Sequence, residues 1–198
     1  MPIYNETFSN NIVLIDHNDS FTYNIVALIN KVSGQKPDII SIENLDLKLL
    51  RKYDKIILSP GSGLPTDYPN SFKIIEKYAN TKTILGICLG HQIIGTFYGA
   101  KMVNLSQAVH GQKKRIKVKN NFSLFAKLPK EFLVGLYHSW VLSLENLPET
   151  LQSIALSEDN LIMAIKHRHK SVYGIQFHPE SFLTEIGEKL MQNFLQLS

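Results

Sequence analysis

Short apolar runs alternate with polar or glycine-containing segments along most of the chain. Residues 11–16 form a continuous apolar run that ends in Asp16, which is typical of a strand buried on both faces of a parallel sheet. Further apolar runs predict strands at residues 37–42, 55–58, 83–85 and 172–177.

Segments with helical character lie between these strands. Residues 69–78 place Phe72, Ile75 and Tyr78 roughly on one side of a helix. Asp19 or Ser20 is suited to cap a helix that contains residues 25–29. Further helices are predicted at residues 92–98 and 185–197, with a short helical connection at 45–53.

The pattern changes after residue 98. Residues 113–119 alternate charged and apolar side chains, as a half-exposed strand does. Other strands are predicted at residues 101–103 and 132–140, followed by a hairpin of residues 152–156 and 161–166. Strands that first alternate with helices and then form hairpins predict an α/β fold. We expect an open, mostly parallel sheet flanked by helices, with an antiparallel extension.

Length and composition indicate one globular domain. We assign residues 11–198 to it, and residues 1–10 to a polar N-terminal extension. The net charge of +4 accompanies no recognised nucleic-acid motif, so a solvated lysine surface is favoured over nucleic-acid binding. A single cysteine excludes an intrachain disulfide, and no apolar run approaches the ~20 residues of a membrane span. The first residues also lack a secretory signal pattern, so we expect a cytoplasmic protein without membrane contact.

Candidate chemistry begins at the sequence Gly86-Ile87-Cys88-Leu89-Gly90, which lies between a predicted strand and a predicted helix. A sharp turn in this context can hold a nucleophile in strained geometry, and glycines remove the side chains that would clash there. The N-terminus of the following helix favours a thiolate. On these residues alone, Cys88 is equally well explained as a small buried apolar residue.

A base and its orienting partner follow the last predicted strand, as His178-Pro179-Glu180. Residues two apart leave an extended chain on the same face, so the Glu180 carboxylate can orient the His178 imidazole. A His-Pro pair can also simply end a strand. Together with Cys88, however, the pattern contains a nucleophile, a base and an orienting carboxylate.

These motifs resemble the class I, or triad-type, glutamine amidotransferases, whose fold is flavodoxin-like. Within that family the chain is most similar to glutaminase subunits of anthranilate synthase and aminodeoxychorismate synthase, partly through Asp19-Ser20-Phe21-Thr22. The resemblance runs from about residue 11 to the C-terminus. It implies that Cys88, His178 and Glu180 are catalytic, and it places the segment 19–24 near a synthase subunit.

The resemblance also implies a set of glutamine-binding and oxyanion-hole residues. The loop Gly61-Ser62-Gly63, with Ser62 where the family has proline, would supply one oxyanion donor, and the N–H of Leu89 would supply the second. We expect the Ser62 change to leave the hole intact and the loop more mobile. Gln92 would contact substrate, and Ser139 and Trp140 would bind the α-amino and α-carboxylate end of glutamine through the backbone. Leu136 and Trp140 replace the arginine and leucine that are common at these positions.

The implied reaction is hydrolysis of glutamine through a Cys88 thioester, with ammonia passed to a chorismate-binding aminase subunit. No cofactor and no metal are expected in this chain. His91, His110 and His138 are interpreted as structural, His138 as a hydrogen-bonded buried residue, and residues 167–169 as a solvated turn. The alternatives are a related γ-glutamyl cysteine hydrolase and a non-catalytic binding or regulatory subunit.

Overall fold

The computed structural model describes residues 11–119 and 122–198, so the predicted extension at residues 1–10 lies outside the described residues. The strands are β1 (Ile12–His17), β2 (Asp38–Ser41), β3 (Lys55–Gly61), β4 (Thr83–Ile87), β5 (Met102–Val118), β6 (Glu131–Leu142), β7 (Leu151–Ser157), β8 (Ile162–His167) and β9 (Val172–Ile175). The helices are α1 (Thr22–Ser33), α2 (Pro69–Tyr78), α3 (Leu89–Phe97) and α4 (Gly187–Gln196). Short 3-10 turns are η1 (Ile42–Asn44), η2 (Leu47–Lys52), η3 (Pro65–Asp67) and η4 (Ser123–Phe125).

Within the described residues these strands form one sheet in the order β2-β1-β3-β4-β9-β8-β7-β5-β6. The pairs from β2 through β9 are parallel, and the pairs from β9 onward are antiparallel. The parallel half has the doubly wound order of flavodoxin-like folds, which bind ligands at the carboxyl ends of the strands. The predicted fold class is confirmed.

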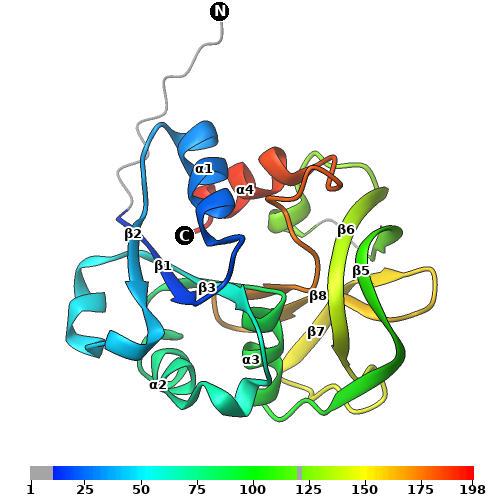
Figure 1. The fold of residues 1–198 in the computed structure, drawn as a ribbon, viewed down its shortest axis with the longest axis horizontal. Coiled ribbons are helices and arrows are strands. Elements are labelled where there is room, and N and C mark those ends of the chain that lie inside the picture. The colour runs from blue at the N-terminus through cyan, green and yellow to red at the C-terminus, as the bar shows by residue number, and fades with distance from the viewer. Residues whose placement is uncertain (1–10, 120–121) are drawn as a thin grey trace, which may run out of the picture.

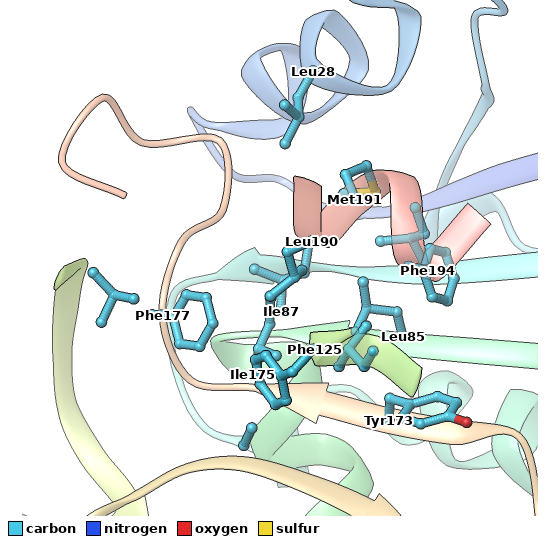
Figure 2. Packing of buried hydrophobic residues seen from close by; sticks show 14 of the residues in the cluster. Leu28, Leu85, Ile87, Phe125, Tyr173, Ile175, Phe177, Leu190, Met191 and Phe194 are labelled. Carbon is cyan, nitrogen blue, oxygen red and sulfur yellow. The ribbon is translucent and has the colours of Figure 1, made fainter. Parts of the chain in front are cut away.

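Strands β1, β3, β4 and β9 are buried on both faces, which explains their continuous apolar runs. Along β1, Ile12 and Leu14 join one core cluster, whereas Val13 and Ile15 join the other. The first cluster lies beneath α1 and α4, which pack together on one face (Figure 1). In Figure 2, side chains of α4 meet apolar residues of β4 and β9. The second cluster packs beneath α2 and α3.

Several predicted boundaries were wrong. The predicted strands at residues 101–103 and 113–119 are parts of one strand, β5, which pairs with β6 on both sides of two register shifts. β9 ends at Ile175, two residues before the predicted end. α1 begins after Phe21 without a side-chain cap, and Asp19 Oδ1 instead accepts the Phe21 N–H at 2.8 Å. No described helix is long and apolar enough to cross a membrane.

Close packing of α3 on β3 depends on Gly90. A Cβ on Gly90 would lie 2.3 Å from the backbone oxygen of Leu58, which cannot move without disturbing the sheet.

We expect Gly90→Ala to lower the free energy of unfolding by about 3 kcal/mol, as overpacking does. Gly34→Ala is the control, because its Cβ would meet nothing within 4 Å and only the φ of 72° is strained. Its expected cost is about 1 kcal/mol. Equal urea midpoints for the two variants would contradict the packing argument.

Candidate active site

Cys88 occupies a strained turn at the carboxyl end of β4. Its φ of 51° and ψ of −101° are unusual for a residue other than glycine, and it immediately precedes α3. The backbone N–H of Cys88 donates to the Ile175 carbonyl at 2.8 Å, which ties the turn to β9. A Cβ on Gly86 would lie 2.2 Å from the Gly90 oxygen, so the turn requires glycine there. The predicted elbow geometry is confirmed.

His178 and Glu180 form a buried pair beyond the end of β9. His178 Nδ1 lies 2.6 Å from Glu180 Oε1, and the His178 side chain is 2% exposed. The segment is a turn rather than the extended strand that we expected, but the contact forms nonetheless. The His178 N–H donates to the Gly135 carbonyl at 3.2 Å, and Thr184 Oγ1 donates to the His178 carbonyl at 2.6 Å. These bonds fix the imidazole to β6 and to the loop before α4.

The charge state of His178 depends on Cys88. Burial lowers the pKa of His178, but the charge of Cys88, followed by Glu180, outweighs burial and raises the pKa to about 10. Within the described residues Nε2 of His178 makes no hydrogen bond. The arrangement therefore favours an imidazolium at His178 beside the Cys88 sulfur, where it can exchange a proton with a substrate.

Two aromatic rings that the sequence analysis did not select hold the imidazole. Phe21, in the loop before α1, and Tyr137, on β6, contact the His178 ring with centroids at 5.3 and 4.9 Å. The Tyr137 hydroxyl lies 3.0 Å from Ser181 Oγ. Phe21 lies in the segment 19–24 and Tyr137 lies in the predicted strand 132–140. The sequence did not indicate that the two rings contact His178. Phe21 gives the segment 19–24 a role at the site itself, whereas its predicted place near a synthase subunit stays a prediction.

The loop Gly61-Ser62-Gly63 lies against the elbow. A Cβ on Gly61 would be 2.7 Å from Leu89 Cδ2, so the loop backbone approaches the start of α3 closely. Gly63 has a φ of 82°, and the Ser62 carbonyl accepts the Tyr68 hydroxyl at 2.9 Å. This hydrogen bond restrains the loop at Ser62, the position at which the family has proline. The oxyanion role of the Gly61 loop and of Leu89 stays a prediction.

Two of the predicted glutamine-binding residues, Gln92 and Trp140, contact each other. Gln92, one turn into α3, is buried, and its Nε2 donates to the Trp140 carbonyl at 2.8 Å. Ser139 and Trp140 are partly buried near the end of β6. A residue that the sequence analysis missed, Gln176, donates its Nε2 to Cys88 Sγ at 3.6 Å. It stands two residues before His178, and nothing in its own pattern indicated this contact.

The remaining histidines differ partly from expectation. His91 and His138 are buried, and burial lowers their pKa to about 3 and about 4. Backbone groups of Gly174 and Trp140, respectively, partly offset this effect of burial, and the hydrogen-bonded state of His138 stays a prediction. His167 is buried, and its Nδ1 accepts the N–H of His169 at 3.0 Å. The prediction that residues 167–169 form a solvated turn was therefore partly wrong. His110 packs against Tyr137. Among the described residues no three His, Cys, Asp or Glu side chains form a metal-binding group.

The His17 side chain packs against the Gly61 loop. Its buried ring lies between Ser59 Oγ, 3.1 Å from Nδ1, and Ser71 Oγ, 2.9 Å from Nε2. Ser59 donates its own proton to the Pro60 carbonyl at 2.6 Å, so Nδ1 of His17 must carry the proton that it shares with Ser59. Nε2 then accepts from Ser71, which requires a neutral imidazole.

Acid should therefore destabilise the fold through His17. Burial lowers its pKa from 6.5 to about 4, so the unfolded chain binds the proton more readily than the folded chain. The resulting stability is present above pH 6.5 and is lost as the pH falls from 6.5 to 4, by up to about 1.4 kcal/mol per pH unit. We expect His17→Gln to flatten this part of a plot of unfolding free energy against pH. His169→Gln, at an exposed histidine, should keep the wild-type slope; equal slopes for all three proteins would contradict the assignment.

Known proteins resemble this chain over nearly its whole length. Residues 13–197 match the family described as Glutamine amidotransferase class-I. Anthranilate synthase component 2 of Saccharolobus solfataricus is 39% identical over 190 residues, covering 92% of this chain and 96% of that protein. The protein of the same name from Pyropia yezoensis is 38% identical over 190 residues, covering 94% of this chain and all of that protein (100%). The crystal structure of a glutamine amidotransferase from Thermotoga maritima has the same fold. It superposes with a TM-score of 0.79 at 17% identity, over 94% of this chain and 96% of that chain. This chain therefore belongs to the class I glutamine amidotransferases.

Proposed function

We propose that the protein is a glutaminase subunit that hydrolyses glutamine to glutamate and ammonia through a thioester on Cys88. The observation that carries the proposal is the strained Cys88 turn beside a buried His178 that is paired with Glu180 at 2.6 Å. A nucleophile, a base and an orienting carboxylate in contact are what acyl transfer from an amide requires.

The first half of the reaction forms the thioester. The Cys88 thiolate attacks the side-chain amide carbon of glutamine, and the amide carbonyl becomes an oxyanion. The C–N bond then breaks as the His178 imidazolium gives its proton to the departing nitrogen, which leaves as ammonia. Once the sulfur is acylated it no longer carries the charge that raised the His178 pKa, so that pKa falls and His178 gives up its proton more readily. Proton release to ammonia is therefore coupled to thioester formation.

The second half returns the enzyme to its starting state. Neutral His178 takes a proton from water, the hydroxide adds to the thioester, and the C–S bond breaks to give glutamate and the Cys88 thiolate. Glu180 orients the ring and stabilises the imidazolium that re-forms. N–H groups of the Gly61–Gly63 loop and of Leu89 would hold the oxyanion in both halves.

The remaining assignments concern substrate and partner. Gln92, Ser139 and Trp140 would hold the glutamine, and no cofactor is needed for these steps. Relatives named anthranilate synthase component 2 support a partnership with a component I subunit. We propose that this subunit binds chorismate and receives the ammonia in the cytoplasm. Their name favours anthranilate as the product, and aminodeoxychorismate is the alternative.

An exposed aromatic residue beside the site suits a partner contact. Phe182 is 91% exposed and lines, with Asn24 and Glu180, a cleft of about 490 Å³ between α1 and the loop after His178. Tyr23, 73% exposed, precedes Asn24 in the segment expected near the synthase. Aromatic residues at the centre of an interface often dominate its binding energy.

We expect Phe182→Ala to weaken binding of a chorismate-binding component I about tenfold in calorimetric titration. Leu49→Ala is the control, because Leu49 is 51% exposed but lies in η2. Its affinity should stay within about twofold of wild type. Equal affinities for both variants would place the interface elsewhere.

The function itself is tested by glutamate release from glutamine, measured with the chain alone and with component I plus chorismate. We expect release that increases with the partner, and the aminated product identifies the pathway. Release from γ-glutamyl peptides in preference to glutamine would favour the hydrolase alternative. No release from folded protein bound to its partner would leave the non-catalytic subunit.

A further inference from the structure

Gln176 is a buried polar residue that the proposed reaction leaves without a role. It follows β9 directly, and none of its surface is exposed (0%). Its backbone N–H donates to the Met163 carbonyl on β8 at 2.9 Å, which fixes its main chain to the sheet. Burying an amide without partners is costly, so the hydrogen bonds of its side chain decide what it does.

These hydrogen bonds form a chain, and the chain begins at a group that can only accept a hydrogen bond. Gln92 Nε2 lies 2.8 Å from the Trp140 carbonyl oxygen, which can only accept, so the NH₂ group of Gln92 must face it. The same Nε2 lies 3.2 Å from Gln176 Oε1 and donates its second proton there. Gln176 therefore presents its oxygen to Gln92, and its Nε2 faces Cys88 Sγ at 3.6 Å.

We propose that Gln176 is a positioning residue for the nucleophile: it donates an N–H to the Cys88 sulfur and links that sulfur, through Gln92, to the Trp140 carbonyl. The inference rests on the proposed function, because it assigns a further residue to the same site. The direction of these hydrogen bonds supports the proposal. Each amide donates toward the next acceptor, and the last acceptor is the sulfur.

A neutral amide suits this position chemically. It stays a donor at every pH, so it stabilises the sulfur most when the sulfur carries negative charge, because hydrogen bonds to charged groups are the stronger ones. The Cys88 sulfur is negative before attack on glutamine and again when it leaves the thioester. Gln176 therefore stabilises the sulfur at both of these stages of the reaction.

The chain also couples the nucleophile to the predicted glutamine subsite. Both N–H groups of Gln92 are engaged, so its Oε1 is the atom left for substrate. The Trp140 carbonyl belongs to the strand segment that would hold the α-carbon end of glutamine. A displacement of β6 at Trp140 would be transmitted to Cys88 through two amides. Loss of Gln176 should therefore lower kcat and leave KM nearly unchanged.

The test is the alkylation rate of Cys88 by iodoacetamide in the full chain, measured from pH 6 to 9 by mass spectrometry. Cys88 is the only cysteine in the sequence, so the rate reports one sulfur. We expect Gln176→Leu to slow alkylation at pH 7 about tenfold. Gln176→Glu keeps the length and the acceptor for Gln92 but turns a carboxylate toward the sulfur, so it should be slower still. In the glutaminase assay with component I, kcat should fall about tenfold with KM within twofold.

Asn193→Leu provides the matched control. Asn193 is also a buried amide, but it donates to the carbonyls of Leu124 and Ala126, away from Cys88. The variant should lose stability and keep the wild-type alkylation profile. Folded Gln176→Leu with wild-type alkylation and kcat would overturn the proposal. Alkylation does not require glutamine hydrolysis, so slowed variants of a chain without glutaminase activity would refute the proposed function and leave the positioning role standing.

Discussion

Replacing Cys88 with alanine is expected to lower glutamate release by about 10⁴-fold or more, because the thioester can no longer form. What remains is the acceleration that substrate binding and the oxyanion donors provide for direct attack by water. The assay compares wild type and Cys88→Ala, each with component I and chorismate. Supply of free ammonium should restore the aminated product with the variant, since the synthase step itself needs only ammonia.

Cys88→Ser is the matched variant, because it keeps the shape and replaces the sulfur with oxygen. A hydroxyl is a far weaker nucleophile at neutral pH, so its activity should fall nearly as far. Affinity for component I should stay at the wild-type value in both variants, because Cys88 is 6% exposed and cannot form much of an interface. Glutamate release within about tenfold of wild type from Cys88→Ala would refute the thioester mechanism.

Much of the fold could be predicted because its signals are local. The continuous apolar runs reflect strands whose alternate residues enter two cores, as Val13 and Leu14 do on opposite faces of β1. The glycines at 86 and 90 marked a turn in which a side chain has no room. β5 was predicted only as two separate strands, because its interruptions near Gly111 resemble a loop, while pairing with β6 carries the strand through them.

The site could be predicted only where its residues share a motif. Cys88 and the pair His178–Glu180 each lie in one, and the resemblance to a family joined them. Phe21 and Tyr137 come from two other segments, whereas Gln176 stands two residues before His178, and tertiary packing brings the three side chains to the imidazole and the sulfur.

Glu180→Gln tests whether the carboxylate charge, and not only its shape, is required. In wild type Glu180 Oε1 contacts His178 Nδ1 at 2.6 Å, whereas Oε2 is buried and has no hydrogen-bond partner in the described part of the chain. A glutamine must place its NH₂ group at one of these positions. Facing Nδ1, it would donate to the ring and put the imidazole proton on Nε2, so that Nε2 could no longer accept one. Facing the other way, it would bury an unpaired donor and leave the imidazolium without its counter-charge.

Either orientation should lower kcat for glutamate release by about 10³- to 10⁴-fold, as loss of an orienting carboxylate does in comparable triads. Glu158→Gln makes the same chemical change on the surface, where Glu158 pairs with Arg115 at 3.5 Å and its side chain is 62% exposed. That control should retain full activity. Circular dichroism and binding to component I would establish that Glu180→Gln is folded. If the folded variant keeps kcat within about threefold of wild type, His178 does not depend on the charge of Glu180, and the triad reduces to a Cys88–His178 pair.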